Sequence, residues 1–458
     1  MHILLVGLGR EGWSSFQFFL NNFPPETKFE LVDDQVRGNL VKKWQTTEID
    51  QLVVNQRIQF WTTNSFLENF ALNSNELIAV VSPGIPPRHS LVEWLDRAGV
   101  PQTSNTQLFF DIAMPDRATN SNLELPKLLQ QPILIGVTGT KGKSTTTAAI
   151  HHVLRSAGVP TVLGGNIGVP PLDLVKSLQT NVTERTYVVL ELSCHQLAQL
   201  TTSPHIAVVM SITPEHLDYY PDFAQYQKAK AAICRYQNKE DLVIYASDNE
   251  AATQIAQLSP GTKLTIPQVS PVIAASSLKL VGQHNYHNVL PSVLISLRLG
   301  ITPQVIQASL IDFAGLPHRL QLVAEHNQVR YYNDSLATTP EATIAAIQSF
   351  EGQSIILIAG GFDRGLDYVQ LARAIDSSSV KAVLLLPTTG EKIAQQLHKV
   401  TPVDLLVEEV PDLTTAVERA KQLATPEDVV LLSPASASFN QFKDYAERGE
   451  AFIKLVTP

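Results

Sequence analysis

The sequence predicts an α/β protein with several parallel β-sheets. Ten short apolar runs are each followed by turn residues such as Gly, Ser or Pro and then by a helical pattern. The runs lack strict alternation of apolar and polar residues, which is typical of strands buried on both faces of a parallel sheet. Their alternation with helices argues against an all-α or all-β protein. The expected strands are Ile3–Val6, Phe29–Val32, Ile78–Val81, Ile133–Val137, Tyr187–Leu192, Ile206–Ile212, Leu242–Tyr245, Ile355–Ala359, Ala382–Leu386 and Val429–Leu432.

The length indicates more than one domain. At roughly 150 residues per domain, the 458 residues predict about three domains. Helical stretches end near Val100–Asn105 and near Gly315–Leu316, and we place the boundaries there. The expected domains are residues 1–104, 105–315 and 316–458.

Composition and charge argue against several classes of protein. The chain has 34 Lys+Arg against 43 Asp+Glu, a net charge of −9, so it has no broad basic footprint and nucleic acid is not expected as a partner. No run approaches the ~18 apolar residues that span a membrane, and the first residues, MHILLVGLGREG, do not read as a secretory signal. Cys194 and Cys234 are too few for a disulfide framework or a zinc cluster. We expect a cytoplasmic protein without a membrane partner.

A glycine-rich loop lies between the fourth expected strand and a helical pattern. It reads GTKGKS over residues 139–144. Glycines let backbone N–H groups curl around a phosphate, and the start of a helix adds a favourable dipole. We expect Lys143 to neutralise the β- and γ-phosphates of ATP and the Ser144 hydroxyl to bind Mg²⁺. The loop is a shortened variant of the Walker pattern, which would have glycine at Val137, and a turn without a ligand is the structural alternative. The predicted ATP-binding residues are Gly139, Thr140, Lys141, Gly142, Lys143, Ser144 and Thr145.

A second glycine motif, GLGREG, follows the first expected strand. Gly7, Gly9 and Gly12 match G-x-G-x-x-G, and Asp33 ends the next strand, where a ribose-binding acid lies in dinucleotide-binding folds. Ser82 opens another turn, SPGI, placed to surround the same ligand. The pattern fits a nicotinamide dinucleotide or another pyrophosphate-linked sugar nucleotide. Close packing of helix against strand, with no ligand, is the structural alternative.

Two polar side chains follow strands of the central region. Glu191 ends the strand Tyr187–Leu192, and a carboxylate there suits Mg²⁺, which prefers oxygen ligands. His216 follows the strand Ile206–Ile212. A lone histidine is more often structural, but in parallel sheets ligands sit beyond the carboxyl ends of strands. Both residues are therefore candidates for a metal site.

Lys230 lies within the apolar stripe of a predicted helix. Phe223, Tyr226, Lys230 and Ile233 follow spacings of 3, 4 and 3 and share one face, whereas Lys228 lies off it. Burial lowers the pKa of a lysine and makes the neutral amine available for chemistry. Carbamate formation with CO₂ would turn this cation into an oxygen ligand. The alternative is a lysine that buries its stem and extends its charge to solvent.

Several polar turns in the last third of the chain are candidate anion sites. Asn285 and Asn288 lie three apart near the start of a helix, Arg319 follows the second boundary, and Asp334 lies in a polar turn that opens a helix. GGFDRG at 360–365 and SPASAS at 433–438 follow strands of the last domain and resemble anion-binding turns. Each is equally compatible with ordinary loop chemistry.

Taken together, these motifs resemble the Mur ligase family, the ATP-dependent ligases that form amide bonds in peptidoglycan precursor synthesis. GTKGKS, ELSCHQ, TPEHLDYY…YQKAK, GQHNYHN, GLPHR, NDSLATT and LLSPASASFNQFKDYAERG occur in this order and cover most of residues 130–458. GLGREG, SPGI, GNIG and SPASASFNQF are most similar to the branch that adds D-glutamate to UDP-N-acetylmuramoyl-L-alanine.

The resemblance implies an N-terminal Rossmann-like domain for the uridine nucleotide, a central P-loop ATPase-type domain, and a C-terminal Rossmann-like domain for the amino acid. It implies ATP and two Mg²⁺ ions but no NAD, and UDP-N-acetylmuramoyl-L-alanine and glutamate as small-molecule partners; we expect a monomer.

The resemblance also implies roles for individual residues. The implied catalytic residues are Lys143, Glu191, His216 and Lys230, and the implied metal ligands are Ser144, Glu191, His216 and a carbamylated Lys230. Further ATP contacts are Asn285, Asn288, Arg319 and Asp334. The implied contacts to the UDP-linked substrate are Gly9, Arg10, Gly12, Asp33, Ser82, Asn166 and His216, and those to the amino acid are Thr338, Arg364, Ser438 and Tyr445.

The implied reaction activates a carboxylate as an acyl phosphate before an amine displaces the phosphate. Two departures bear on the amino acid: Leu336 and Arg364 stand where the D-glutamate branch usually has lysine. L-glutamate, another amino acid and a folylpolyglutamate-type reaction are therefore alternatives within the family. A nicotinamide-dependent dehydrogenase would use GLGREG but leaves GTKGKS and Lys230 unexplained, and a P-loop NTPase that drives motion or signalling is the remaining alternative.

Overall fold

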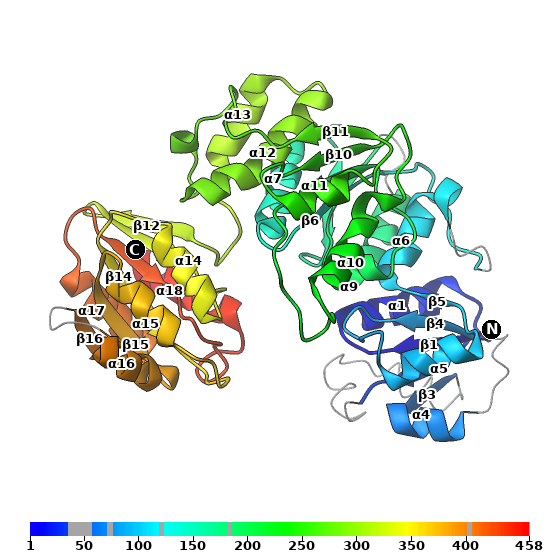
Figure 1. Cartoon of the computed structure of the whole chain (residues 1–458), viewed down its shortest axis with the longest axis horizontal. Helices are drawn as coiled ribbons and strands as arrows, with labels where there is room; N and C mark the ends of the chain where they lie inside the picture. The colour runs from blue at the N-terminus through cyan, green and yellow to red at the C-terminus, as the bar shows by residue number, and fades with distance from the viewer. Residues whose placement is uncertain (35–56, 71–76, 119–122, 181–184, 401–404, 458) are drawn as a thin grey trace. The chain divides into compact units, whose positions relative to one another are not determined.

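The structure, a computed structural model, describes residues 1–34, 57–70, 77–118, 123–180, 185–400 and 405–457. These residues form three β-sheets with helices packed around them (Figure 1). Neighbouring strands of the described residues pair in parallel, except for one antiparallel hairpin in the third sheet. The predicted α/β class with parallel sheets is confirmed.

The first sheet has the strand order β3-β2-β1-β4-β5. Helices α4 and α5 bury one of its faces through Phe66 and Leu95, and α1 packs on the other face, where Phe16 meets Phe29. Its strands are β1 (His2–Val6), β2 (Lys28–Val32), β3 (Ile58–Trp61), β4 (Leu77–Val81) and β5 (Gln102–Thr103). The helices are α1 (Arg10–Asn22), α4 (Thr63–Asn69), α5 (Ser90–Ala98) and α6 (Asn105–Ala113).

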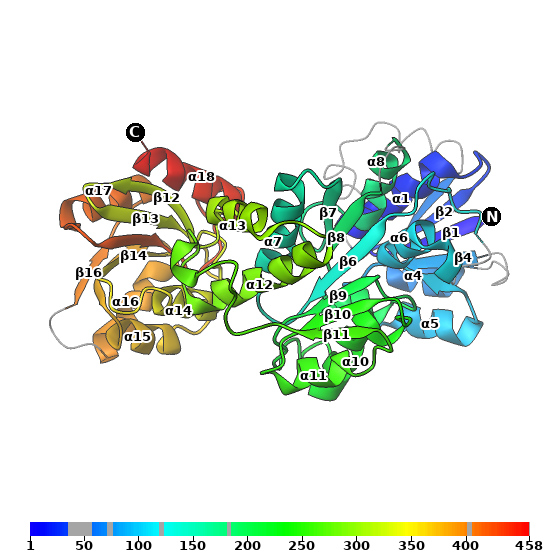
Figure 2. The same cartoon turned by 90° about the horizontal axis from the view of Figure 1, so that it is seen from above.

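The second sheet has the order β11-β10-β9-β6-β8-β7, which can be followed in Figure 2, where β6 lies between β8 and β9. Its central strand β6 leads directly into the glycine loop and helix α7. The strands are β6 (Ile133–Thr138), β7 (Thr161–Gly165), β8 (Tyr187–Glu191), β9 (Ile206–Val209), β10 (Leu242–Tyr245) and β11 (Thr262–Thr265). The helices that follow in sequence are α7 (Lys143–Ser156), α8 (Val175–Thr180), α9 (Cys194–Ala198), α10 (Phe223–Arg235), α11 (Glu250–Ala256), α12 (Gln283–Arg298) and α13 (Pro303–Asp312), and short 3₁₀ turns cover Pro115–Arg117, Pro171–Leu174 and Ala275–Ser277.

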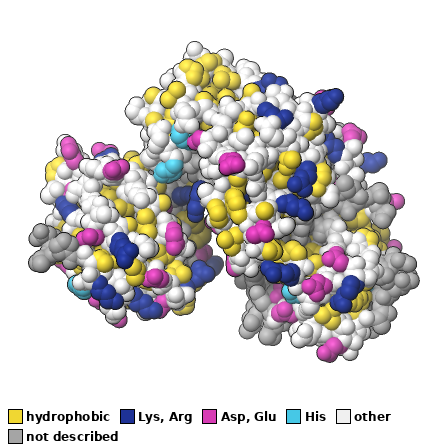
Figure 3. Space-filling view, in the orientation of Figure 1, with side chains coloured by type: hydrophobic (Ala, Val, Ile, Leu, Met, Phe, Trp, Pro, Cys, Tyr) yellow, Lys and Arg dark blue, Asp and Glu magenta, His cyan; other side chains and the backbone are white. Residues whose placement is uncertain are grey.

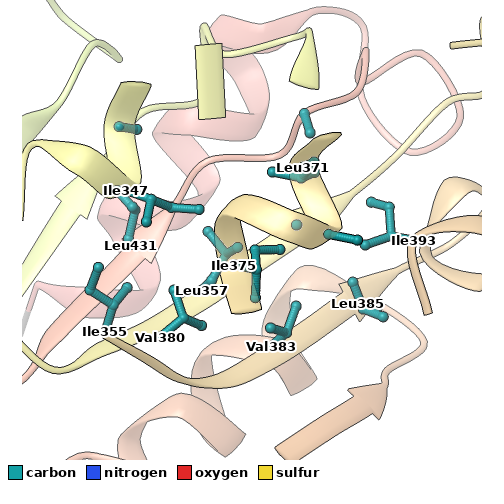
Figure 4. Close-up of a cluster of buried hydrophobic side chains, with 14 of the residues drawn as sticks. Ile347, Ile355, Leu357, Leu371, Ile375, Val380, Val383, Leu385, Ile393 and Leu431 are labelled. Carbon is teal, nitrogen blue, oxygen red and sulfur yellow. The ribbon is translucent and has the colours of Figure 1, made fainter. Parts of the chain in front are cut away.

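The third sheet has the order β12-β13-β17-β14-β15-β16 and a hydrophobic core on each face. Figure 4 shows the first core, in which Ile347, Leu371 and Ile393 point from three helices toward Leu357 and Leu385 of the sheet. Helices α17 and α18 cover the other face. The strands are β12 (Gln321–His326), β13 (Val329–Asn333), β14 (Ile355–Gly360), β15 (Val380–Leu386), β16 (Leu406–Glu409) and β17 (Val429–Leu432). The helices are α14 (Pro340–Gln348), α15 (Val369–Asp376), α16 (Thr389–Val400), α17 (Leu413–Leu423) and α18 (Tyr445–Val456).

All ten predicted strands are present, and the strands that the sequence did not reveal are mainly those at sheet edges. β3, β5, β7, β11, β12 and β16 each pair on one side only, so they carry more polar or half-exposed residues and lack a continuous apolar run. The missed strand β13 forms the antiparallel hairpin with β12, whose turn places Asn327 and Gln328 at positive φ. The expected strand Ile206–Ile212 is too long: it ends at Val209, and the backbone then turns so that Ser211 accepts a hydrogen bond from Thr140 at 2.8 Å.

The chain divides into two compact units. One unit comprises Met1–Gln268 with Leu290–Ile301 and contains the first two sheets; the other comprises Val269–Val289 with Thr302–Pro458 and contains the third sheet. The domain limits at residues 104 and 315 stay a prediction.

Among the residues that the structure describes, no helix is both long and apolar enough to cross a bilayer. On the face drawn in Figure 3, acidic and basic side chains are intermingled on both units.

A buried arginine holds two turns at the third sheet together. The Arg448 guanidinium is 1% exposed and donates to the Ser335 hydroxyl at 2.9 Å and to the carbonyl oxygens of Ser335, Ser436 and Ala437 at 2.9, 3.0 and 3.3 Å. Burial lowers its pKa to about 10. Because these bonds go to neutral oxygens, Arg448 positions the loops after β13 and β17 without an ion pair.

We predict that Arg448→Met destabilises the unit that contains the third sheet by about 3 kcal/mol or more, because three buried carbonyl groups lose their donor. Differential scanning calorimetry of the full chain measures the loss as a lowered transition temperature. Arg373→Met is the matched control, because Arg373 is exposed on α15. An unchanged transition in Arg448→Met would contradict the assignment.

Candidate functional site

A cleft of about 690 Å³ lies at the carboxyl ends of β1, β2 and β4 in the first sheet. Its wall includes the glycine turn after β1, the acidic pair after β2 and the SPGI turn after β4, and residues of the second sheet close one side. Of the predicted contacts to a UDP-linked substrate, the cleft brings together Gly9, Arg10, Asp33, Ser82 and Asn166. Gly12 and His216 are not among its lining residues.

The glycine turn requires glycine for two separate reasons. Gly7 has φ +81°, and a Cβ on Gly12 would lie 2.0 Å from the carbonyl oxygen of Gly7. The Ser82 hydroxyl donates to the same Gly7 oxygen at 2.5 Å, and the Asp33 carboxylate accepts from the Leu8 N–H at 2.7 Å. Gly12 therefore acts by letting helix α1 start close to β1, while Asp33 and Ser82 hold the turn in shape.

Arg10 connects the cleft to the second sheet. Its guanidinium donates to the carbonyl oxygens of Gly165, Asn166 and Gly168, at 3.1, 2.8 and 3.2 Å. The Asn166 side chain in turn donates to Glu191 Oε1 at 2.7 Å. The predicted substrate residues and the predicted metal ligand therefore belong to one continuous set of contacts.

The glycine loop of the second sheet has the form expected of a phosphate site. Gly139 and Gly142 have φ of +156° and +83°, and α7 begins directly at Lys143. Lys143 Nζ donates to the Thr140 carbonyl at 2.9 Å, which folds its ammonium over the loop. Lys141 points outward, with 78% of its side chain exposed. The loop thus offers backbone N–H groups, a helix start and one lysine to an anion.

Lys230 is buried, as the helical stripe predicted. It is 1% exposed, whereas Lys228 is exposed. Its Nζ donates to the Gly139 carbonyl at 2.8 Å and lies 4.8 Å from the centre of the Tyr226 ring. Burial, assisted by the nearby positive charge of Lys143, lowers its pKa to about 7, although Glu191 opposes the shift. A large share of Lys230 is therefore a neutral amine at neutral pH.

Glu191 provides an open oxygen beside Lys230. It is 1% exposed, and within the described part of the chain its Oε2 has no hydrogen-bond partner. A buried, unpaired carboxylate oxygen costs free energy and fits a cation or donor supplied by a ligand. In the described ranges, no cluster of three or more His, Cys, Asp or Glu side chains has the arrangement of a metal site.

His216 does not line the cleft, but its ring lies beside that of His195, which does. The His216 backbone has φ +56°, and its ring centre is 5.0 Å from that of His195. The His216 side chain is 43% exposed and lies 3.8 Å from Glu215. His195 does line the cleft, and burial, followed by the His216 charge, lowers its pKa to about 4. His195 therefore presents a neutral ring at physiological pH.

The other predicted ATP residues lie in the unit that contains the third sheet, and three of them form hydrogen bonds within that unit. Asp334 accepts from the Leu320 N–H at 3.1 Å and from the Ser433 hydroxyl at 2.7 Å, and burial raises its pKa to about 7. The Asn285 side chain donates to Val281 and accepts from Asn288. In this structure, Asp334, Asn285 and Asn288 thus shape the loops; Arg319 is half-buried next to His318.

The predicted amino-acid residues lie on the turns that Arg448 holds together and on the neighbouring GGFDRG turn. Thr338 follows β13, Arg364 follows β14 and is exposed, and Ser438 and Tyr445 follow β17. Ser438 is buried and Tyr445 is 41% exposed. Phe362 and Phe439 lie exposed beside them, with ring centres 6.0 Å apart. These residues all follow the carboxyl ends of parallel strands.

Sequence reasoning missed Glu11, His195 and the positioning residue Arg448. Glu11 lies inside GLGREG and His195 inside ELSCHQ, so the position after a strand was a usable signal for both. Nothing in the local sequence marks Arg448, because its partners come from turns more than 100 residues away and from the turn after β17.

Comparisons with known proteins agree with this geometry. The Mur ligase middle domain matches residues 137–272, and the domain described as "Mur ligase, glutamate ligase domain" matches residues 318–436. The chain is 34% identical over 402 residues to a UDP-N-acetylmuramoylalanine–D-glutamate ligase of Natranaerobius thermophilus, with 83% of each chain covered.

A relative named for L-glutamate and a solved structure are also similar to this chain. A UDP-N-acetylmuramoyl-L-alanine–L-glutamate ligase of Micromonospora sp. is 33% identical over 409 residues, covering 85% of this chain and 84% of the relative. The solved MurF ligase of Thermotoga maritima in complex with ADP superposes with a TM-score of 0.55 at 15% identity, with 94% of each chain covered, and so supports the fold.

Proposed function

The chain belongs to the Mur ligase family, and we propose that this ATP-dependent, amide-bond-forming ligase adds D-glutamate to UDP-N-acetylmuramoyl-L-alanine. One observation carries the proposal beyond the family resemblance. The cleft of the first sheet and the phosphate loop of the second sheet lie in one compact unit, and Arg10, Asn166 and Glu191 connect them through direct contacts. A sugar nucleotide in the cleft would thus extend toward the phosphate loop. The same proposal places the reaction in the cytoplasm, where ATP is available.

L-glutamate is a second candidate for the incoming amino acid. A relative named for L-glutamate is as similar to this chain as those named for D-glutamate. In addition, Leu336 gives the turn after β13 no cation for a second carboxylate at that position. The exposed Arg364 remains as a partner that pairs with carboxylates through two hydrogen bonds.

The reaction consists of two displacements. A carboxylate oxygen of the substrate bonds to the γ-phosphorus of ATP while the bond to the bridging oxygen breaks, which gives an acyl phosphate and ADP. The amine then attacks the acyl carbon, phosphate leaves with the electrons of the C–O bond, and the amine loses a proton. Phosphoryl transfer depends on positioning and charge neutralisation. Lys143 and the N–H groups at the start of α7 supply these to the phosphates.

The side chains at the phosphate loop offer oxygen ligands of the kind that Mg²⁺ prefers. Glu191 Oε2 is buried and, among the described residues, unpaired, and Ser144 lies in the first turn of α7. Ser144, Glu191 and a carbamate on Lys230 would hold the ion, and we propose His216 as a contact at its edge. When bound, Mg²⁺ reduces the repulsion between the phosphate and the attacking carboxylate. The chain itself keeps Glu191 in place through Asn166 and lowers the pKa of Lys230 by burial.

We predict that Lys143→Ala lowers ADP release by at least about 100-fold, because the phosphates lose their nearest cation. A coupled assay of ADP release with UDP-N-acetylmuramoyl-L-alanine, ATP and glutamate measures the loss. Lys228→Ala is the control, because that lysine is exposed on α10 and lies outside the phosphate loop. A rate for Lys143→Ala equal to that of the control would refute the role of Lys143.

The amino acid is identified by measuring ADP release with D-Glu, L-Glu, D-Asp, Lys and diaminopimelate in turn. We expect D-Glu to give the highest kcat/KM, and a higher value with L-Glu would establish the second candidate. With ¹⁸O in the acyl carboxylate of the substrate, the label must appear in the released phosphate. Phosphate release that is independent of any amino acid, without transfer of ¹⁸O, would contradict the ligase reaction itself.

A carbamate on Lys230 gives a further expected outcome. In ¹³C-bicarbonate buffer, the wild-type protein should show a carbamate carbon signal that is absent from Lys230→Met, because only a neutral amine reacts with CO₂. Lys228→Met is the control, since that lysine is exposed on the same helix. A signal that survives in Lys230→Met would place the carbamate elsewhere.

A further inference from the structure

Glu11 carries a buried carboxyl group in the wall of the cleft, and the proposed reaction does not use this group. It lies in the first turn of α1, directly after the glycine turn, and lines the same cavity as Gly9 and Arg10. Its backbone carbonyl accepts from the Asn105 side chain at 3.2 Å, which ties this turn to α6. Glu11 therefore occupies a defined position where the phosphates of a nucleotide ligand would approach a helix start.

The neighbouring amide determines what each Glu11 oxygen does. Gln196 Oε1 accepts from the Ser193 N–H at 2.9 Å as part of the capping box of α9, so the Gln196 NH₂ group must face Glu11. That NH₂ group donates to Glu11 Oε1 at 2.7 Å. Glu11 Oε1 is thereby held as an acceptor, and any proton on this carboxyl resides on Oε2.

Glu11 Oε2 is the carboxyl oxygen that Gln196 leaves without a hydrogen bond. It is buried and has no hydrogen-bond partner among the residues that the structure describes. Burial raises the pKa of Glu11 to about 7, although Gln196 and Arg10 oppose the shift. Below neutral pH the side chain is thus largely a neutral acid with one O–H group available to donate to a phosphate oxygen.

Among the residues that the structure describes, no ionisable group forms an ion pair with Glu11. Arg10 is on the same helix turn, but its guanidinium donates to carbonyl oxygens of residues 165–168. On the 3₁₀ turn that packs against α1, Asp173 accepts from the Ser14 hydroxyl at 2.6 Å. The other ionisable groups that line the cleft are Asp33, Asp34, His89 and His195. Because two of these are acids, an ionised Glu11 would add to a negative wall and repel an anionic ligand.

We propose that Glu11 binds the diphosphate of the sugar nucleotide as a neutral carboxylic acid, with Oε2–H donating to a phosphate oxygen. The inference rests on the proposed function, since it assumes that the cleft takes a UDP-linked substrate. A bound phosphate anion disfavours ionisation of the carboxyl further. Ligand binding above neutral pH therefore takes up a proton from solvent, and the affinity falls as pH rises.

Isothermal titration calorimetry of UDP-N-acetylmuramoyl-L-alanine into the full chain tests this at pH 6 and pH 8. Because only the protonated fraction binds, Kd should rise about tenfold between the two pH values. At pH 8, repeating the titration in buffers of different ionisation enthalpy should show an uptake of about one proton per ligand. The carboxylate of the ligand titrates at about pH 3.5 and does not contribute.

Three variants test whether Glu11 is the group that takes up the proton when the ligand binds. Glu11→Gln keeps an acceptor for Gln196 and a permanent N–H donor for the phosphate, so its Kd at pH 8 should match the wild-type value at pH 6, with no proton uptake. Glu11→Ala should bind more weakly at both pH values, also without uptake. Asp34→Asn changes another carboxylate of the cleft and should keep the proton uptake of the wild type.

The outcomes separate this inference from the proposed function. Wild-type binding with the same Kd at pH 6 and pH 8, or proton uptake that persists in Glu11→Gln, would overturn the role of Glu11 while leaving the cleft as the substrate site. Loss of proton uptake in Asp34→Asn instead of Glu11→Gln would also overturn it. Failure of the wild-type protein to bind the ligand at either pH would overturn the function proposed for the cleft.

Discussion

The arrangement of the site depends on hydrogen bonds that join the first sheet to the second. Three of them run from Arg10 in the glycine turn to the backbone of residues 165–168, at the end of β7. Asn166, in that segment, also holds Glu191 at the end of β8. Further bonds from Gln196 to Glu11 and from Ser14 to Asp173 cross the same boundary. The cleft and the phosphate loop are therefore joined by several direct contacts within one compact unit.

Burial, rather than ion pairing, sets the pKa of three ionisable groups at or near the candidate sites. Lys230, Glu11 and Asp334 have pKa values of about 7, and in each case the largest cause is loss of solvent. Lys230 becomes available as an amine, Glu11 as a hydrogen-bond donor, and Asp334 stays bonded within its turn. Parallel sheets explain this pattern: the loops after their strands are enclosed on several sides, so polar groups there are desolvated.

The sequence predicted the interior of each sheet well because central strands pair on both sides and are apolar throughout. Edge strands such as β11 and β16 escaped prediction because their outer side faces solvent and permits polar residues. For the site, spacing alone predicted the burial of Lys230, since a helix has a known period. For His216, the position after β9 placed it near the site, but only the structure shows that His195, with a ring centre 5.0 Å away, lines the cleft while His216 does not.

From the sequence by itself follow the α/β class, the phosphate loop, the glycine turn and the family, because each depends on residues close together in the chain. The tertiary structure alone decided which oxygen of Glu11 is unpaired, that Arg448 joins turns more than 100 residues apart, and that Arg10 connects two sheets. The physical reason is that protonation and hydrogen-bond direction depend on neighbours in space. Those neighbours come from segments whose separation along the chain leaves no local pattern.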